Sequence, residues 1–358
     1  MAIERIRVLG LGKVGELVAH LLRGAGFDVA GGDLRPRSDL GFPVDAVDVF
    51  DPDGLRRGLA GFDAVVSCLP FDRNLGVAEA AAGAGLHYFD LTEDVPTTTR
   101  IRELAAGADV VMAPQCGLAP GLIGIVGSSL AEGLTDLRRM QLRVGALPQH
   151  PSGVLGYSFT WSPEGVINEY INDCEVIRDG QRTEVPAMSD RETVVIGGAR
   201  LEAFATSGGL GTLCETYEGR IRHLDYKSLR YPGHCDAIRF LLDELALRDR
   251  RELAGEILVN AKPPVDDDVV HLYAAVEGTG PDGLTRREHV RSWQPLEIAG
   301  RRWRAISWTT AASAVGVVEL VARGAVPAKG FLRQEDVALS ELLATTTGRL
   351  FAEEALTP

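Results

Sequence analysis

The segment Ile6–Gly15, IRVLGLGKVG, restricts the fold more than any other part of the chain. A short apolar run leads into the pattern G-x-G-x-x-G, and the following GELVAHLLRGAGF has the apolar spacing of a helix. Glycine allows a tight turn at the first position, close approach of a pyrophosphate at the second, and packing of helix on strand at the third. The start of the helix directs backbone N–H groups towards the phosphates. We therefore predict a dinucleotide site formed by Gly10, Gly12, Lys13, Val14 and Gly15.

The choice of dinucleotide is indicated by Asp33, which ends the next apolar run, DVAGGD. An acid in this place accepts a hydrogen bond from the ribose 2′-hydroxyl of NAD and repels a 2′-phosphate. Arg35 and Arg37 follow and have the opposite preference, because guanidinium groups bind phosphates. The sequence favours NAD as the cofactor and leaves NADP as the alternative.

Composition and charge weigh against several classes of protein. The formal net charge of −13, with no run of Lys or Arg, argues against a nucleic-acid partner. No stretch approaches about 20 uninterrupted apolar residues, so no membrane span is expected. The first strand begins too early for a signal peptide, and we expect a cytoplasmic protein. The five cysteines lack metal-ligand spacing, so we expect reduced thiols and no metal site.

The first part of the chain alternates strand patterns with helical patterns. Strands are expected over 6–9, 28–31, 64–67, 88–90 and 110–112, and LRRGLAG, NLGVAEAAAGAG and TTTRIRELAAGA are typical of helices. This rhythm predicts an α/β fold with a doubly wound parallel sheet and a ligand site at the carboxyl ends of its strands. We assign this dinucleotide-binding domain to residues 1–125.

From about Asp136 the pattern changes. MQLRVGAL, CEVIRDG, RTEVPA, RLEAFATS and DVVHLYAAVEGTG alternate as strands do, and PGHCDAIRFLLDELAL is a clear helix among them. These segments predict an inserted mixed α+β domain for the substrate over residues 126–303. RRWRAISWTTAASAVGVVELVARGA then indicates a strand and an apolar helix. Residues 304–358 are expected to return to the first domain.

Several segments resemble the saccharopine dehydrogenase-like family, and most of all its lysine 6-dehydrogenases. They are LGLGKVG near the start, CGLAPG at 116–121, TWSPEGVINEY at 160–170, GGLGTLCET at 208–216 and LRYPGH at 229–234. The resemblance implies a Rossmann domain, an inserted domain that also dimerises, and nicotinamide-dependent chemistry at a carbon–nitrogen bond of a small amino-acid or amine substrate. DLTEDV at 90–95 departs from the lysine 6-dehydrogenase pattern, where substrate would approach the nicotinamide.

Arg230, Tyr231 and His234 form the strongest candidate cluster for the substrate. An arginine fork suits a bidentate carboxylate, which an amino acid would supply. His234 is expected to begin a helix, where the pKa of a histidine tends to fall and the neutral form needed by a base is favoured. Catalytic roles are predicted for His234 and Tyr231, and the alternative for His234 is a structural role.

Two expected strand ends supply further candidates. The first is Ser67, Cys68, Leu69 and Pro70, which would lie beside the cofactor ribose or form an ordinary strand end. The second is Asp90, Thr92 and Glu93, which would hold a substrate ammonium or cap the following helix. Of these, Glu93 is a candidate catalytic carboxylate.

Five further positions are candidates for contacts in the site. Cys116 and Gly117 are expected to position the cofactor through packing and backbone hydrogen bonds, since no covalent step requires a nucleophilic thiol. Arg143 is a second candidate for the substrate carboxylate, or for an internal ion pair. Trp161 would close over substrate or pack in the core, and Thr212 would approach substrate from a glycine-rich turn.

Three functions are compatible with the sequence. The first is oxidation of the terminal amine of lysine or a similar ω-amino acid, with NAD as the acceptor. The second is a saccharopine-type reductive condensation of an aldehyde with an amino acid. The third is a dinucleotide-binding protein without catalytic activity. In each case we expect a homodimer.

Overall fold

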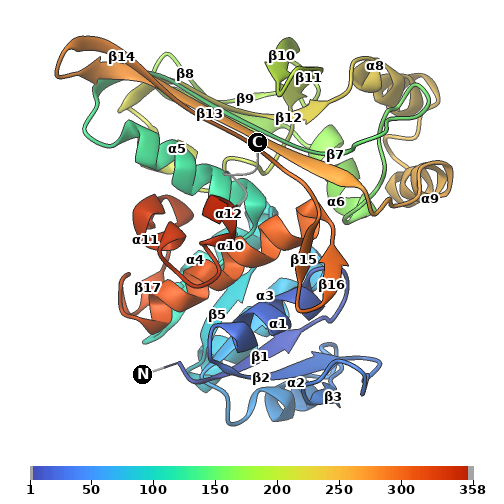
Figure 1. The fold of residues 1–358 in the computed structure, drawn as a ribbon, viewed down its shortest axis with the longest axis vertical. Coiled ribbons are helices and arrows are strands. Elements are labelled where there is room, and N and C mark those ends of the chain that lie inside the picture. The colour runs from blue at the N-terminus through green and yellow to red at the C-terminus, as the bar shows by residue number, and fades with distance from the viewer. Residues whose placement is uncertain (1–2, 354–358) are drawn as a thin grey trace. The chain divides into compact units, whose positions relative to one another are not determined.

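The computed structural model describes residues 3–353, which form two compact units (Figure 1). One unit consists of the residues up to Ile125 together with those from Ser307 onward, and the other is Val126–Ile306. The first unit is therefore discontinuous in sequence.

The first unit is built on a seven-stranded parallel sheet with the order β17-β6-β5-β4-β1-β2-β3. Its strands are β1 (Arg5–Leu9), β2 (Asp28–Asp33), β3 (Val44–Ala46), β4 (Ala64–Ser67), β5 (His87–Asp90), β6 (Val111–Ala113) and β17 (Gly330–Phe331). The predicted doubly wound parallel sheet is confirmed, and its order around β1 is that of dinucleotide-binding folds. The strands that sequence analysis did not predict, β3 and β17, have only three and two residues.

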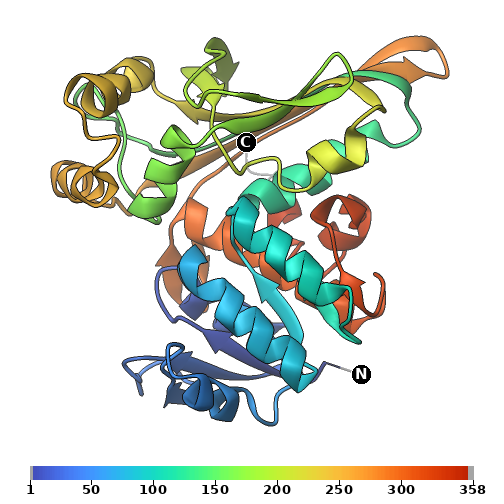
Figure 2. The same cartoon turned by 180° about the vertical axis from the view of Figure 1, so that it is seen from behind.

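Helices cover both faces of this sheet. Figure 2 shows α3 and α4 in front of it, and Figure 1 shows α10 in front of it from the opposite side. The helices are α1 (Gly15–Gly24), α2 (Pro52–Leu59), α3 (Phe71–Ala84), α4 (Val95–Ala105), η1 (Leu118–Leu122), α10 (Ala305–Ala322), η3 (Gln334–Asp336), α11 (Leu339–Leu343) and α12 (Leu350–Glu353). In residues 3–353, α10 is the one helix long and apolar enough to cross a membrane, and 83% of it is buried, as in a core helix.

The second unit contains a mixed sheet. Its main order is β10-β11-β12-β7-β13-β14, and β8 pairs with both β12 and β9. The strands are β7 (Thr135–Pro148), β8 (Cys174–Arg178), β9 (Gln181–Val185), β10 (Glu192–Ile196), β11 (Ala199–Ala205), β12 (Ile221–Arg230), β13 (Asp268–Gly280) and β14 (Gly283–Trp293), followed by the hairpin β15 (Leu296–Ile298) and β16 (Arg301–Trp303). β7 and β12 are parallel, whereas the other pairs are antiparallel. The predicted mixed α+β composition is confirmed.

An apolar core in the second unit joins helix α6 to strands β11 and β12. It includes Tyr157, Phe159, Tyr170, Phe204 and Leu229, all nearly inaccessible to solvent. The helices of this part of the chain are α5 (Ile123–Ala131), α6 (Pro163–Ile171), α7 (Leu213–Tyr217), α8 (His234–Arg239), η2 (Phe240–Glu244) and α9 (Arg251–Ala261). β12 ends at Arg230 and α8 begins at His234. Because residues of both elements belong to this core, the core holds Arg230 and His234 in place.

Candidate functional site

The glycine-rich turn between β1 and α1 has the geometry that a pyrophosphate requires. Gly10 has a φ of +82°, a conformation that other residues rarely adopt. A Cβ atom at Gly15 would lie 1.8 Å from the carbonyl oxygen of Gly10, whereas one at Gly12 would meet nothing within 4 Å. The turn is therefore closely packed underneath and open above Gly12, where a phosphate would approach. Lys13 is exposed and Val14 is half-buried at the start of α1.

Asp33 is placed at the end of β2, as the sequence predicts. Its carboxylate accepts from the backbone N–H groups of Leu11, at 2.8 Å, and of Arg35, at 3.1 Å. These contacts hold the acid against the glycine-rich turn and leave further lone pairs for a ribose hydroxyl. Arg37 forms ion pairs with Glu16 and Asp39, so Arg35 is the more available of the two arginines to a phosphate.

The end of β4 lies directly beside the glycine-rich turn. A Cβ at Gly10 would be 2.9 Å from the Cδ2 of Leu69, and one at Gly15 would be 3.0 Å from the Cβ of Cys68. Ser67 is buried, and its hydroxyl donates to the Oδ1 of Asn74 at 2.7 Å. Pro70, which follows, is exposed. The structure thus brings Cys68 and Leu69 to the predicted cofactor cradle, while the Ser67 side chain faces the interior.

Asp90 joins the ends of β5 and β6 from a fully buried position. Its carboxylate accepts from the hydroxyl of Tyr88 at 2.7 Å and from the backbone N–H groups of Thr92 at 2.9 Å and Gln115 at 3.0 Å. Burial raises the pKa of this carboxyl to about 6, although the three hydrogen bonds oppose the shift. The structure therefore gives Asp90 a role in positioning two turns, instead of the predicted contact with a substrate ammonium.

The turn after β5 leaves Glu93 as the candidate for proton transfer. The hydroxyl of Thr92 accepts from the backbone N–H of Asp94, and the carboxylate of Asp94 caps α4 by accepting from Thr97. The helix cap is thus Asp94, the last residue of the D-x-T-E-D stretch for which capping was the alternative, and not Asp90, Thr92 or Glu93. Glu93 itself is half-buried, and desolvation, with the charges of Asp94 and Asp90, raises its pKa to about 7.

Cys116 and Gly117 lie at the crossover that follows β6. The backbone N–H of Cys116 donates to the carbonyl of Asp90 at 2.9 Å, and its thiol lies 3.1 Å from the carbonyl of Ala113. The amide of Gln334 donates to the Cys116 sulfur at 3.3 Å. Burial, with the charge of Asp90, raises the pKa of the Cys116 thiol. A buried thiol held in this way packs the crossover and has no nucleophilic character.

In the second unit, Arg230 ends β12 in a buried aromatic environment. Its Nε donates to the Tyr170 hydroxyl at 2.7 Å, and its Nη1 donates to the carbonyl of Leu229 at 2.8 Å. The guanidinium carbon lies 4.7 Å from the ring centroid of Tyr157 and 5.6 Å from that of Tyr170. The carboxylate of Glu169 lies 4.0 Å from Nη2, beyond hydrogen-bond distance.

His234 begins α8 as predicted, but both nitrogens of its ring are used within the protein. Nε2 lies 3.0 Å from the Tyr170 hydroxyl, and Nδ1 lies 2.8 Å from the carbonyl of Leu155. The ring is fully buried and stacks on Phe204. Burial, with the nearby charge of Arg230, lowers the pKa of His234 to about 3. The pKa is lowered as predicted, but burial and the charge of Arg230 lower it, and not the start of the helix. Both ring nitrogens have partners within the chain, so the geometry supports the structural alternative.

The other candidates of the second unit have structural partners of their own. The Tyr231 hydroxyl donates to the carbonyl of Pro148 at 3.0 Å. Trp161 is half-buried and packs against the core that contains Tyr170. Thr212 is buried at the start of α7. Tyr231 and Trp161 therefore both pack against the apolar core that contains Tyr170. The catalytic role predicted for Tyr231 and the substrate contact predicted for Trp161 remain hypotheses.

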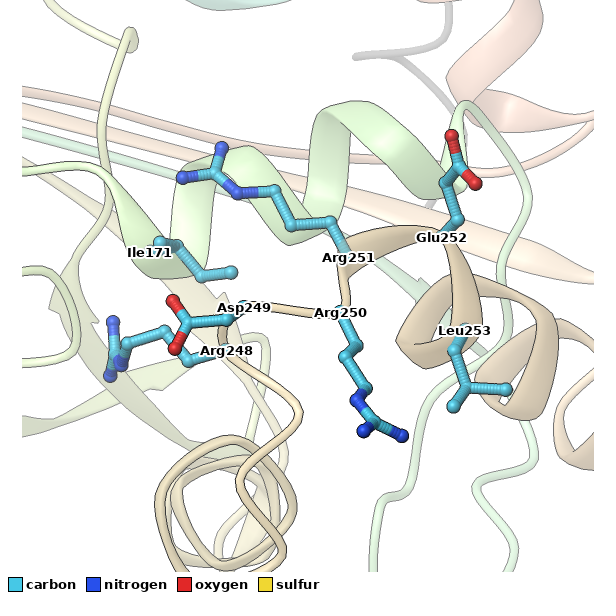
Figure 3. A pocket seen from close by; sticks show the side chains of 7 residues that line it. All are labelled: Ile171, Arg248, Asp249, Arg250, Arg251, Glu252 and Leu253. Atoms are coloured by element: carbon cyan, nitrogen blue, oxygen red, sulfur yellow. The ribbon is translucent and has the colours of Figure 1, made fainter.

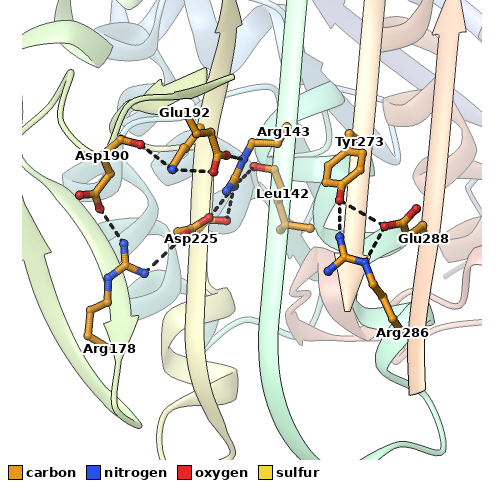
Figure 4. A network of polar contacts seen from close by, with 10 residues as sticks. Leu142, Arg143, Arg178, Asp190, Glu192, Asp225, Tyr273, Arg286 and Glu288 are labelled. Atoms are coloured by element: carbon orange, nitrogen blue, oxygen red, sulfur yellow. Dashed lines mark hydrogen bonds and ion pairs between the residues drawn. The ribbon is translucent and has the colours of Figure 1, made fainter. Parts of the chain in front are cut away.

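Arg143 lies in a network of charges on β7 and its neighbours (Figure 4). Its Nε lies 2.6 Å from Glu192, and its Nη1 lies 2.5 Å from Asp225. Two carboxylates from the same chain neutralise this buried arginine, so the internal ion-pair alternative describes it and the predicted substrate contact is not supported. Asp225 in turn pairs with Arg178, which reaches Asp190 at 2.7 Å.

An open cavity of about 740 Å³ lies near the start of α9 (Figure 3). Arg248, Arg250 and Arg251 line it, but their guanidinium groups point in different directions. Arg248 is paired with Asp243, and Arg251 donates to Asn168. This cavity therefore lacks a converging set of donors for an anion.

Sequence analysis did not identify Glu169 or Tyr157, which lie around Arg230. A signal for Glu169 exists in the spacing of α6, because Val166, Glu169 and Tyr170 are at i, i+3 and i+4 and share one helix face. The buried face of α6 contains Val166 and Tyr170. Glu169 lies on the same face as these two buried residues, and an acid there is a candidate for a functional carboxylate.

Within residues 3–353, no group of three or more His, Cys, Asp or Glu side chains is arranged to hold a metal ion. The five cysteines are free thiols; they are Cys68, Cys116, Cys174, Cys214 and Cys235.

Comparisons with known proteins agree with this architecture. Residues 6–110 match the family model of the saccharopine dehydrogenase NADP binding domain, and residues 117–353 match that of the saccharopine dehydrogenase C-terminal domain. The NADP(+), L-glutamate-forming saccharopine dehydrogenase of Schizosaccharomyces pombe is 24% identical over 154 residues, which are 41% of this chain and 34% of that protein. The Saccharomyces cerevisiae protein of the same name is 21% identical over 281 residues, 74% of this chain and 60% of that protein.

This chain thus spans less than two thirds of the length of these curated relatives. The solved structure of apo saccharopine dehydrogenase (L-Glu forming) from Saccharomyces cerevisiae has a TM-score of 0.75 with 17% identity, and the match covers 96% of this chain and 98% of that one. That likeness shows a shared fold. With both domain models matched in order along most of its length, the chain belongs to the saccharopine dehydrogenase family.

Proposed function

We propose that this protein is a nicotinamide-dependent dehydrogenase that acts on the carbon–nitrogen bond of an amino acid, oxidising the terminal amine of lysine or a similar ω-amino acid. Its support is the family, the open backbone above Gly12, and the motifs CGLAPG and LRYPGH, which resemble the lysine 6-dehydrogenases. The nicotinamide, when bound, accepts the hydride.

The observation that carries this proposal is the difference between two buried arginines. The side chains of Arg143 and Arg230 are 1% and 4% exposed. Arg143 contacts two carboxylates at 2.5–2.6 Å. Arg230 instead donates to a hydroxyl and a carbonyl, both neutral, and Glu169 remains at 4.0 Å. A counter-ion at 4.0 Å that makes no hydrogen bond compensates a buried charge only in part. Arg230 is therefore suited to bind the carboxylate of an amino-acid substrate.

Glu93 is the residue we propose for proton transfer. An amine must lose a proton before it can release hydride, because an ammonium has no lone pair. The product imine then takes up water and separates into an aldehyde and ammonia. A carboxyl whose pKa is raised to about 7 is well matched to accept the first proton near neutral pH.

We propose NAD as the preferred coenzyme on the basis of Asp33. Its carboxylate ends β2 beside the glycine-rich turn and opposes a 2′-phosphate. The family model and the curated relatives carry NADP in their names, and exposed Arg35 would serve that alternative. Comparison of kcat/KM for the two coenzymes decides the choice, and a higher value with NADP would overturn it.

The central test is incubation of the purified protein with lysine and either coenzyme, followed at the absorbance of reduced nicotinamide. We expect lysine-dependent reduction with release of ammonia. No turnover with lysine, diamines or other basic amino acids would contradict the proposal.

A second candidate is the saccharopine-type condensation, which the names of the curated relatives favour. In that reaction, an aldehyde and the amine of an amino acid form an imine with loss of water, and the reduced coenzyme then donates hydride. Oxidation of reduced coenzyme that requires both an aldehyde and glutamate would identify this activity, whereas lysine oxidation needs no second organic substrate.

A further inference from the structure

Arg37 lies in an ion-pair cluster on the loop that follows β2. Its Nη1 donates to the Oε2 of Glu16 at 3.0 Å. Its Nε and Nη2 donate to the two carboxylate oxygens of Asp39, at 3.1 Å and 2.8 Å. All three nitrogens of this guanidinium therefore have a carboxylate partner within the chain.

Glu16 is the buried member of this cluster. It directly follows Gly15 in the first turn of α1, and its side chain is 9% exposed. The side chains of Arg37 and Asp39 are 42% and 67% exposed, and ion pairs between solvent-exposed groups contribute little. Glu16 is therefore the partner that holds the Arg37 side chain against α1.

The backbone of this loop is fixed at both of its ends. At the first end, the carboxylate of Asp33 accepts from two backbone N–H groups. At the other end, Leu40 and Phe42 are buried, and the ring of Phe42 meets that of His20 edge-on, with 5.5 Å between centroids. A change at Glu16 should therefore alter the direction of the Arg37 side chain and not the path of the loop.

An arginine close to the ribose acid is the group that accommodates the 2′-phosphate of NADP. We propose that Glu16 is a specificity-determining residue, which disfavours NADP by holding Arg37 against α1 and away from the 2′-position of the adenosine ribose. Without the Glu16 charge, only the weak pair with exposed Asp39 restrains Arg37, and its guanidinium can bind the 2′-phosphate. This inference rests on the proposed choice of coenzyme and adds a determinant outside the ribose contact.

The test compares two coenzymes that differ only in the 2′-phosphate. Fluorescence titration of the full chain with NADH and with NADPH gives a Kd for each, and the ratio of Kd for NADPH to Kd for NADH measures discrimination. In Glu16→Gln we expect this ratio to fall at least about tenfold, the size of one charge-assisted hydrogen bond, through tighter binding of NADPH. Adding Arg37→Gln to Glu16→Gln should return the ratio to within about threefold of the wild-type value, because no guanidinium is left to release.

Asp53→Asn is the matched control for the loss of one negative charge. Asp53 lies in the first turn of α2, is 72% exposed and pairs with Arg56. Its ratio should stay within about twofold of the wild-type value. The inference is overturned if Glu16→Gln leaves the ratio unchanged. It is also overturned if the double variant keeps the lowered ratio, since the lost charge and not Arg37 would then be responsible.

Arg37→Gln alone tests the inference even where Glu16→Gln fails to fold. The Glu16 charge is then left in the first turn of α1, where it opposes the pyrophosphate that both coenzymes share. We therefore expect similar losses of affinity for NADH and NADPH, with a ratio within about threefold of the wild-type value. A loss of at least about tenfold for NADPH alone would mean that Arg37 already binds the 2′-phosphate, and would overturn the inference.

The same titrations separate this inference from the proposed function. A wild-type preference for NADPH, with a further fall of the ratio in Glu16→Gln, would support the role of Glu16 and refute NAD as the preferred coenzyme. A wild-type preference for NADH, with an unchanged ratio in Glu16→Gln, would support NAD and refute the role of Glu16. Binding of neither coenzyme would refute both. Lysine oxidation does not enter these outcomes, because the titrations contain no substrate.

Discussion

Single buried residues in this protein differ in whether the chain itself satisfies their charges and hydrogen bonds. His234 has partners at both ring nitrogens, and Arg143 has two carboxylates. Arg230 has neutral hydrogen-bond acceptors and an ion pair with Glu169 at 4.0 Å. Contacts with oppositely charged groups of the same chain stabilise the fold, whereas a buried charge whose hydrogen bonds go to neutral groups is the one we propose for a ligand.

The buried neutral state of His234 leads to a prediction about stability at low pH. Its folded pKa of about 3 lies below the usual 6.5, so the unfolded chain binds more protons between these values and stability falls as the pH decreases. From pH 7 to pH 5 this one group should account for about 2 kcal/mol. The variant His234→Gln has no titrating group at this position, so its free energy of unfolding should fall by about 2 kcal/mol less over the same pH interval.

Urea unfolding of both proteins at pH 7 and pH 5, followed by tryptophan fluorescence, measures the difference. His271, whose pKa burial lowers to about 4, is present in both proteins and cancels. Equal losses of stability in the two proteins would contradict the assignment of a neutral, buried His234.

The sequence predicted single residues well where their role depends on nearby backbone. Gly10, Gly15 and Asp33 act through a turn within their own βαβ unit, and their spacing already contains that geometry. The distinction between Arg143 and Arg230 could not be predicted, because it depends on partners from distant segments. Glu192 and Asp225 reach Arg143 only after β7, β10 and β12 have assembled.

At the scale of elements, the turn between β1 and α1 leads to opposite predictions for neighbouring glycines. Gly12→Ala adds a Cβ to open space, so its free energy of unfolding should stay within about 0.5 kcal/mol of the wild-type value. The same methyl would occupy the approach of the pyrophosphate and lower coenzyme affinity at least tenfold. Gly15→Ala should reduce both affinity and stability, because its Cβ would overlap the Gly10 carbonyl.

Gly24→Ala is the matched control on α1, since its Cβ also meets nothing within 4 Å. We expect unchanged coenzyme affinity and slightly greater stability, by a few tenths of a kcal/mol. Fluorescence titration with reduced coenzyme and thermal unfolding measure the two quantities. Full coenzyme affinity in Gly12→Ala would exclude this turn as the pyrophosphate site.

A second element-scale prediction concerns the turns after β5 and β6, which Asp90 joins. Asp90→Ala removes the acceptor for Tyr88, Thr92 and Gln115 and should cost about 3 kcal/mol. Asp90→Asn keeps an oxygen for the two backbone donors and should cost about 1 kcal/mol or less. Chemical denaturation at pH 7 distinguishes these outcomes.

The pH dependence of stability in the wild-type protein and in Asp90→Asn provides a control. The folded pKa of about 6 is above the usual 3.8 for an aspartate. Stability contributed by the protonated form is therefore present at low pH and lost as the pH rises from about 4 to about 6. The wild-type protein should lose stability relative to Asp90→Asn over this interval. A constant difference would contradict the buried carboxyl described here.

Element types were predictable where the pattern was long, and less so where it was short. The periodicity of the first domain correctly predicts β1, β2, β4, β5 and β6. The three-residue β3 and the two-residue β17 carry too few residues to show any period. The stretch DLTEDV was a candidate cap for the following helix, but it offers several acceptors, and only the backbone path makes Asp94 the cap of α4.

For the whole molecule, the division into two compact units predicts separate unfolding. Calorimetric scans of the apo protein should show two transitions. A coenzyme concentration of one hundred times its Kd should stabilise the unit with the glycine-rich turn by about 2.7 kcal/mol and move only its transition. At the same coenzyme concentration, Gly12→Ala should show the same two transitions with a stabilisation of about 1.4 kcal/mol or less, because its affinity is at least tenfold lower. A single transition that moves as a whole would contradict independent units.

The fold class followed from the order of patterns along the chain, since βαβ repeats give parallel sheets and alternating strands give mixed ones. The substrate could not be predicted in this way. Tyr157, Glu169 and Arg230 meet only in three dimensions, and their separations in sequence contain no record of that contact.

The edge strand β17 has a consequence for synthesis on the ribosome. β17 pairs with β6, and Gln334 donates to Pro114 and Cys116 at the crossover that leaves the first unit. These hydrogen bonds join residues 218 to 220 positions apart. During synthesis the sheet of the nucleotide-binding unit therefore remains incomplete until the whole inserted unit has been translated. The inserted unit can therefore acquire its tertiary structure before β17 is synthesised and completes the sheet in which the coenzyme cradle lies.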